Sequence, residues 1–101
     1  MNEADIQRLV MIELSRLGAV VWRNNTGAYK ANERYVRYGL CVGSSDIIGM
    51  YQGRFLAVEV KQPKKKPTQE QQRFINTVNE NGGIAFVACC VEDVKKNLTN
   101  L

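Results

Sequence analysis

Apolar side chains in the first part of the chain recur at steps of three and four residues. They are Ile6, Leu9, Val10, Leu14 and Leu17. This spacing predicts a helix over residues 3–17 with one buried face, and Gly18 is its natural end. Glu3 and Glu13 fall within or at the edge of the apolar stripe. One of them is therefore a candidate to face a functional site. The alternative is that each lies at the helix margin with its carboxylate in water; for Glu3 this is equally favoured, and for Glu13 it is favoured.

The following segments alternate between short β-type runs and polar breaks. Residues 19–23 are mostly β-branched or aromatic and predict a buried strand. Residues 24–34 are polar and favour a loop, and residues 35–38 are a candidate for a brief strand. Residues 43–45, with the sequence Gly-Ser-Ser, form a second break before Asp46.

Two further β-type runs, residues 46–50 and 55–61, are separated by a short segment that suits a hairpin turn. Successive side chains of a strand point to opposite faces of the sheet. The second run therefore places Leu56, Val58 and Val60 on one face, and Phe55, Ala57, Glu59 and Lys61 on the other. Glu59 and Lys61 are expected to point the same way.

The last third of the chain predicts a helix, a strand and a helix. Thr68 followed by Gln71 is a capping box that begins the first of these helices. Its buried stripe is Gln71, Phe74, Ile75 and Val78, and Gly82 with Gly83 ends it. Residues 84–89 predict a buried strand, expected to be parallel to a neighbour because a helical crossover precedes it, and residues 92–98 predict a closing helix. The order of elements predicts an α/β sandwich.

Composition limits the size and the setting of this fold. With 101 residues, 45% of them hydrophobic and 24% charged, we expect a single domain over residues 1–101 with one core and one site. No apolar run is long enough to span a membrane and no basic-then-apolar leader begins the chain, so we expect neither secretion nor membrane insertion. The three cysteines predict no disulfide framework, because Cys89 and Cys90 are neighbours, and they favour a reducing intracellular setting.

Charge and one missing residue type narrow the chemistry. The net charge is +4, and the cationic residues cluster at Lys61, Lys64, Lys65, Lys66 and Arg73, which favours either a nucleic-acid contact or a solvated lysine loop. The chain has no histidine. This absence excludes imidazole as a general base or zinc ligand, and with it the serine and cysteine hydrolase triads. No P-loop or Rossmann glycine motif is present either. Chemistry would rest on carboxylates, lysine and a hard metal.

Asp46, Glu59 and Lys61 are the residues that could carry such chemistry. Hydrolysis of a phosphodiester needs an activated water and neutralised phosphate charge, which a Mg²⁺ or Mn²⁺ ion held by carboxylates can supply. Asp46 and Glu59 would form the minimal cage, and Lys61 could hold the attacking water or stabilise the charged phosphate. An Asp followed by Glu-x-Lys is also found on ordinary antiparallel strands that expose charges to water. The flanking helices, the Gly-Ser-Ser break and the lysine loop favour the catalytic interpretation.

At these positions the chain resembles the restriction-endonuclease-like PD-(D/E)xK superfamily, and within it the virus-type replication-repair nuclease (VRR-NUC) domain. The resemblance covers nearly the whole chain. It rests on Glu3 with Ile6 and Gln7, the Trp22–Gly27 motif WRNNTG, the Gly43–Gly49 motif GSSDIIG, Glu59-Val60-Lys61, Thr68 with Gln71 and Phe74, and Gly82-Gly83. The superfamily's proline before the first acid is replaced by Ser45, which is usual in this branch.

The resemblance implies a restriction-endonuclease-like αβββαβ core with a mixed sheet and metal-dependent cleavage of DNA. It implies Asp46 and Glu59 as ligands of Mg²⁺ or Mn²⁺, with the Val60 carbonyl as a third and no other cofactor. Lys61 would be the catalytic lysine, and Glu3 and Gln71 would support the site. Stand-alone viral and bacterial members are similar to homodimeric, structure-specific endonucleases that act on branched DNA such as Holliday junctions. This implies DNA repair in the cytoplasm of a bacterial or phage-infected cell.

DNA contacts and a partner surface follow less directly from the residues. The candidate phosphate contacts are Arg23, Asn24, Asn25, Lys30, Arg34, Arg37, Lys64, Lys65 and Lys66, which bind without reading bases and so favour recognition of shape. Tyr29 and Tyr35 could stack on an exposed base or close a core edge. Met11 and Ile12 could form a dimer surface or pack under residues 24–34.

Two other functions compete with the nuclease interpretation. A non-catalytic module could hold branched DNA for a separate nuclease, and a small structural protein could carry a lysine loop that is merely soluble. The intact trio Asp46, Glu59 and Lys61 favours the enzyme over both.

Overall fold

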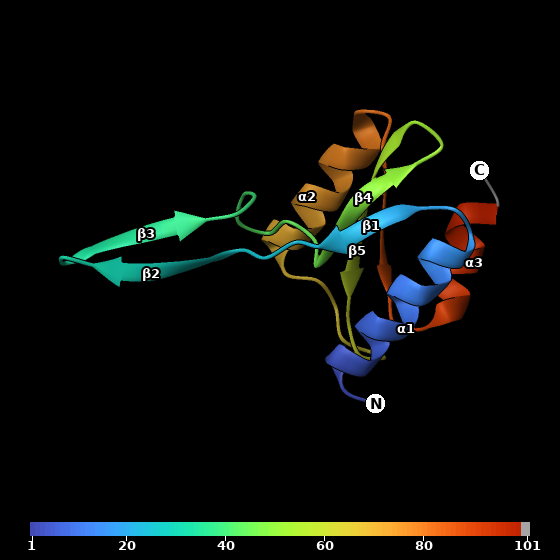
Figure 1. The fold of residues 1–101 in the computed structure, drawn as a ribbon, viewed down its shortest axis with the longest axis horizontal. Coiled ribbons are helices and arrows are strands. Elements are labelled where there is room, and N and C mark those ends of the chain that lie inside the picture. Colours follow the sequence, from blue (N-terminus) through green and yellow to red (C-terminus); the bar gives the residue numbers. More distant parts are fainter. Residues whose placement is uncertain (100–101) are drawn as a thin grey trace.

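The structure is a computed structural model that describes residues 1–99. In chain order its elements are α1 (Glu3–Arg16), β1 (Val20–Arg23), β2 (Gly27–Ala31), β3 (Arg34–Tyr38), β4 (Ile47–Tyr51), β5 (Arg54–Val60), α2 (Gln69–Glu80), β6 (Ile84–Ala88) and α3 (Val91–Thr99). Figure 1 shows a compact body with one hairpin, β2–β3, extending from it. All three predicted helices and the β4–β5 hairpin are confirmed.

The central sheet has the strand order β1-β4-β5-β6. β4 is antiparallel to both β1 and β5, and β6 is parallel to β5, with Val60 opposite Ala88. The parallel pairing confirms the expectation drawn from the helical crossover α2. The mixed sheet covered by helices confirms the predicted restriction-endonuclease-like α/β fold.

Two apolar clusters lie on the two faces of the sheet. Leu56, Val58 and Val60 of β5 point into the larger cluster, which α1 and α3 close with Val10, Leu14 and Val94, among others. Ala57 points into the smaller cluster, which α2 closes with Ile75 and Val78. The alternation along β5 is therefore as the sequence predicts, and it places Glu59 on the face of α2.

Strand β1 lies at the edge of the sheet and is not buried. Val20 and Trp22 are about half exposed, at 58% and 47%. The prediction of a strand was right and that of its burial was wrong, because a β-branched and aromatic run indicates strand without indicating how many neighbours cover it. Gly49 of β4 lets β1 approach closely, since a Cβ there would lie 2.0 Å from the Val20 carbonyl oxygen.

The polar segment after β1 is not the predicted loop. Residues 27–31 pair with residues 34–38 in a two-stranded sheet. Asn32 and Glu33 form its turn, both with positive φ angles of 49° and 65°. Two consecutive left-handed residues give the turn a twist that suits a two-residue hairpin, and Asn tolerates that conformation well. The brief strand predicted over residues 35–38 is confirmed as part of β3.

Helix α1 shows where the side chains of Glu13, Met11 and Ile12 lie. Glu13 is buried at the margin of the helix and forms an ion pair with Arg16, whose Nε donates to Oε1 at 2.9 Å. It thus faces a partner on its own helix. Met11 packs on the larger cluster, whereas Ile12 is 59% exposed, and residues 24–34 extend away in the hairpin direction. The alternative that both pack under that segment is wrong.

Candidate active site

Asp46 is held at the junction of two strands. It stands immediately before β4, and its backbone oxygen accepts a hydrogen bond from the Asn24 backbone N at 2.8 Å. Its Oδ2 accepts a second bond from the Val60 backbone N at 2.7 Å. The carboxylate therefore links the start of β4 to the end of β5, and two paired strands fix its position.

Glu59 lies beside this junction with its side chain buried. The residue is 2% exposed, and its Oε2 lies 4.0 Å from the Nζ of Lys61. The two side chains share a face, as predicted. Within residues 1–99, Oε1 of Glu59 has no hydrogen-bond partner. An ionised carboxylate buried here with no donor to Oε1 is costly, so its charge is compensated either by a proton or by a bound cation.

The electrostatics of Glu59 agree with its burial. Burial raises the pKa of Glu59 from 4.5 to about 8, helped by the negative charge of Asp46 and by a hydrogen bond to the Asp46 carboxylate, and opposed by the ammonium of Lys61. Carboxyl groups with such shifts gather at functional sites. At neutral pH this carboxyl retains a proton unless a cation replaces it.

The donor set fits a hard divalent ion. Asp46 and Glu59 offer carboxylate oxygens from adjacent strands, and the Val60 backbone stands beside Asp46. Mg²⁺ and Mn²⁺ prefer oxygen ligands and take one or two carboxylates from a protein, with water or phosphate completing the shell. The unpartnered Oε1 is the feature that such an ion would satisfy.

Helix α1 closes one side of the junction. A cavity of about 190 Å³ is lined by Glu3, Ala4, Gln7, Asp46 and Val60. Glu3 is exposed in the first turn of α1 and lines this cavity together with Asp46. Gln7 is not among the site residues predicted from the sequence. Its spacing of four from Glu3 places both on one helix face and is the signal that indicates it.

A larger polar groove continues from this cavity toward the hairpin. It has a volume of about 570 Å³ and shares Gln7 and Asp46 with the cavity. Its remaining lining residues are Arg23, Asn24, Asn25, Thr26 and Tyr38. Three of the predicted DNA-contact residues therefore lie next to Asp46.

Asn24 also holds the segment that precedes Asp46. Its side-chain nitrogen donates to Ser44 Oγ at 2.8 Å and to the Ser45 carbonyl at 2.9 Å. With its backbone bond to Asp46, Asn24 secures the Gly-Ser-Ser break in front of the first acid. The amide is occupied inside the protein, which makes Asn24 a positioning residue for Asp46.

Lys30, the Lys64 to Lys66 segment and Gln71 do not line the cavity or the groove at Asp46. Lys30 is exposed on the hairpin, and Lys64, Lys65 and Lys66 are exposed in the segment between β5 and α2. Gln71 completes the predicted capping box, because its Oε1 accepts from the Thr68 backbone N at 2.8 Å. The structure gives Gln71 a role in starting α2.

A second cluster of donor atoms lies at the start of α3. Cys89, Cys90 and Asp93 place their ligand atoms within 4.8 Å of one another. Asp93 already accepts from the Cys89 backbone N at 2.9 Å, and the pKa of the Cys89 thiol is raised to about 11, first by its hydrogen bond to Asp93. Sulfur ligands suit softer ions than Mg²⁺, which prefers oxygen. The oxygen site at Asp46 and Glu59 therefore fits a hard cation better.

The fold and this site together define a nuclease-type α/β domain. A family model of the VRR-NUC domain matches residues 1–93, and the chain belongs to this family. No significant match was found among curated proteins. None of the helices within residues 1–99 is both long and apolar enough to cross a membrane.

Proposed function

We propose that the protein is a Mg²⁺- or Mn²⁺-dependent endonuclease that cuts branched DNA, with Holliday junctions as one such substrate. The observation that carries the proposal is the convergence of Asp46 with buried Glu59 and Lys61, with one Glu59 oxygen left without a partner. Membership of the VRR-NUC family supports a nuclease function.

The three residues have distinct roles in this proposal. Asp46, Glu59 and the Val60 carbonyl would hold the cation, which when bound supplies a Lewis acid and an acidified water. The Lys61 ammonium lies on the same strand face as Glu59 and is 17% exposed, so it is shielded from bulk water yet reachable. Its fixed positive charge would stabilise the additional negative charge on the phosphate during cleavage. Glu3 and Gln7 would orient water or substrate in the cavity that they line.

The groove next to Asp46 supports DNA as the substrate. Arg23 and Asn25 line it, and Lys64 to Lys66 follow the catalytic strand as an exposed cationic segment. Lysine and arginine side chains bind phosphates without reading bases. Recognition would therefore depend on the shape of the DNA.

We also propose a homodimer, which would present two sites to two strands. An exposed apolar row runs across three strands, because Val20 pairs with Met50 and Met50 with Phe55. These side chains are 58%, 53% and 42% exposed. A twofold partner that covers this row, with Trp22 beside it, would remove an apolar surface from water. Light scattering with a Met50→Lys variant tests this surface, and a wild-type monomer at micromolar concentration would exclude it.

The test of the nuclease proposal is a cleavage assay on labelled linear, flap, splayed-arm and four-way DNA. We expect cutting of branched substrates with Mg²⁺ or Mn²⁺ and none with EDTA. Glu59→Ala should abolish cleavage and retain DNA binding. Binding of every substrate without metal-stimulated cleavage would show instead a non-catalytic module that holds DNA for a separate nuclease.

A further inference from the structure

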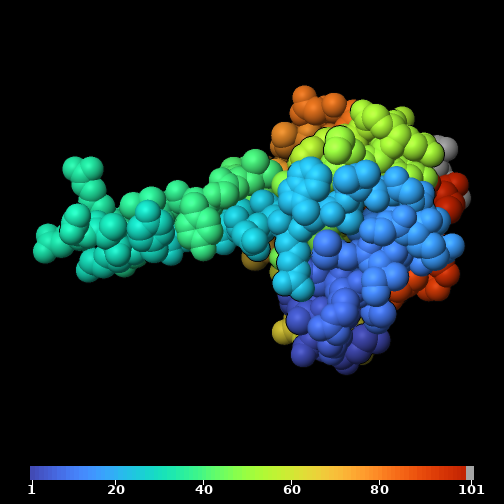
Figure 2. All heavy atoms as spheres, viewed as in Figure 1, coloured from blue at the N-terminus to red at the C-terminus, as the bar shows by residue number. Residues whose placement is uncertain are grey.

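The β2–β3 hairpin stands out from the body and carries exposed aromatic and cationic side chains. Figure 2 shows it as a narrow projection. None of the strand residues of β2 or β3 is buried, and Tyr29, Tyr35 and Tyr38 are 54%, 78% and 52% exposed. A hairpin that buries so little apolar surface contributes little to the core. Its side chains are available for a ligand.

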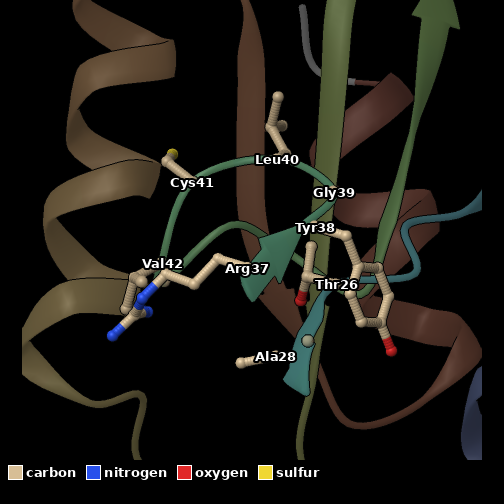
Figure 3. Close-up of a pocket in the computed structure, with 10 residues that line it drawn as sticks. Thr26, Ala28, Arg37, Tyr38, Gly39, Leu40, Cys41 and Val42 are labelled. Carbon is tan, nitrogen blue, oxygen red and sulfur yellow. The ribbon is translucent and has the colours of Figure 1, made fainter. Parts of the chain in front are cut away.

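The register divides these side chains between two faces. Tyr29 is opposite Val36 and Gly27 is opposite Tyr38, so one face carries Tyr29, Val36 and Tyr38. The other face carries Lys30 opposite Tyr35, and Ala28 opposite Arg37. Figure 3 shows Arg37 and Tyr38 leaving β3 in opposite directions. We call the first the aromatic face and the second the basic face.

The aromatic face is ordered by local contacts. The rings of Tyr29 and Tyr38 have centroids 6.3 Å apart and are tilted by 41°. Gly27 makes room for Tyr38, because a Cβ at this position would lie 2.5 Å from the phenol oxygen. The two rings thus form a row that leads along the hairpin toward its base.

This row continues into the proposed active site. Tyr38 lines the groove that also contains Gln7 and Asp46. The aromatic face therefore begins next to the first metal-ligand candidate and ends near the tip of the hairpin. A strand of DNA that lies on Tyr29 and Tyr38 would be directed to Asp46.

We propose that the aromatic face of the hairpin binds unpaired bases of the DNA substrate, with Tyr29 and Tyr38 as stacking residues. The proposal rests on the nuclease function proposed above and, among branched DNAs, favours those with a single-stranded segment, such as flaps and splayed arms, over fully paired four-way junctions. Aromatic rings bind bases of any sequence through stacking, and nearby cations bind the phosphates. Arg34, opposite Ala31, lies on the aromatic face itself. Lys30 and Arg37 lie on the other face and add to the positive charge of a hairpin that carries one carboxylate, Glu33. The same excess of positive charge disfavours the hairpin of a second copy of the chain as the ligand of the aromatic face, because like charges repel.

Tyr35 provides a matched control. It is a tyrosine of the same hairpin with a larger exposed fraction, but it lies on the basic face and does not line the groove at Asp46. The experiment measures fluorescence anisotropy of a labelled oligothymidylate of about 12 nucleotides, which is within the site size of single-strand binding proteins. EDTA is present throughout, so the measurement does not depend on cleavage.

We expect Tyr29→Ala to weaken binding of the oligothymidylate by about tenfold, as loss of one stacked base implies. Tyr29→Phe should bind like wild type, Tyr35→Ala should lose less than threefold, and binding of a blunt duplex should change little in all variants. Equal losses for Tyr29→Ala and Tyr35→Ala, or no loss for Tyr29→Ala, would overturn the proposal. A change of oligomeric state in Tyr29→Ala with unchanged DNA affinity would assign the face to a second copy of the chain. Failure of the nuclease proposal is a separate result, because it would appear as absent cleavage with this binding pattern intact.

Discussion

The raised pKa of Glu59 makes the affinity for a divalent cation dependent on pH. With a pKa of about 8, about one tenth of the Glu59 carboxyl groups are ionised at pH 7 and half at pH 8. A cation needs the ionised form and competes with the proton. The apparent affinity should therefore rise about tenfold from pH 6 to pH 7, about fivefold from pH 7 to pH 8 and less than twofold from pH 8 to pH 9.

Isothermal titration of metal-free protein with Mn²⁺ at these four pH values measures the effect. Glu59→Gln is the control, because it keeps the shape of the side chain and removes its titration. We expect the variant to bind Mn²⁺ more weakly, with an affinity that changes little over the same range. A wild-type affinity that is constant from pH 6 to pH 8 would refute the reasoning, since it would mean that no proton leaves Glu59 when the ion binds.

Three other outcomes follow from the structure. Without metal, the folded state binds the Glu59 proton more tightly than the unfolded state does, so the free energy of unfolding should fall as pH rises from about 4.5 to about 8. Urea titrations of the wild type and of Glu59→Gln measure this fall. An equal pH dependence of the two proteins would contradict it. Asn24→Ala removes two hydrogen bonds in front of Asp46 and should lower the free energy of unfolding by about 1–3 kcal/mol. Its cleavage rate at saturating DNA should fall more than its DNA affinity, and unchanged cleavage would show that the loop needs no support from Asn24. DNA affinity of the wild type should fall steeply between 50 and 200 mM salt, because phosphate contacts release counterions, and a salt-independent affinity would point to another kind of partner.

The elements with strong local signals could be predicted from the sequence. The three- and four-residue spacing of Ile6, Val10 and Leu14 defined α1, and Thr68 with Gln71 defined the start of α2. The alternation along β5 placed Glu59 and Lys61 on one face. These features depend on residues close in sequence, which is why periodicity and capping patterns identify them.

The β2–β3 hairpin, the burial of Glu59 and the contacts of Asn24 and Gln7 could not be predicted from the local sequence pattern. Residues 27–38 lack a buried face, so no alternation of apolar and polar residues marked them as strands. The near-complete burial of Glu59 arises because β4, β6 and α2 surround β5. Asn24 and Gln7 reach Asp46 from segments about twenty and forty residues away, and only the fold brings them together.

Anomalous diffraction from crystals grown with Mn²⁺ would locate the bound cation. We expect a manganese peak between the carboxylates of Asp46 and Glu59, next to the Val60 carbonyl, and no such peak in Glu59→Gln crystals. A peak at Cys89, Cys90 and Asp93 instead, with none at Asp46 in protein that cleaves DNA, would contradict it.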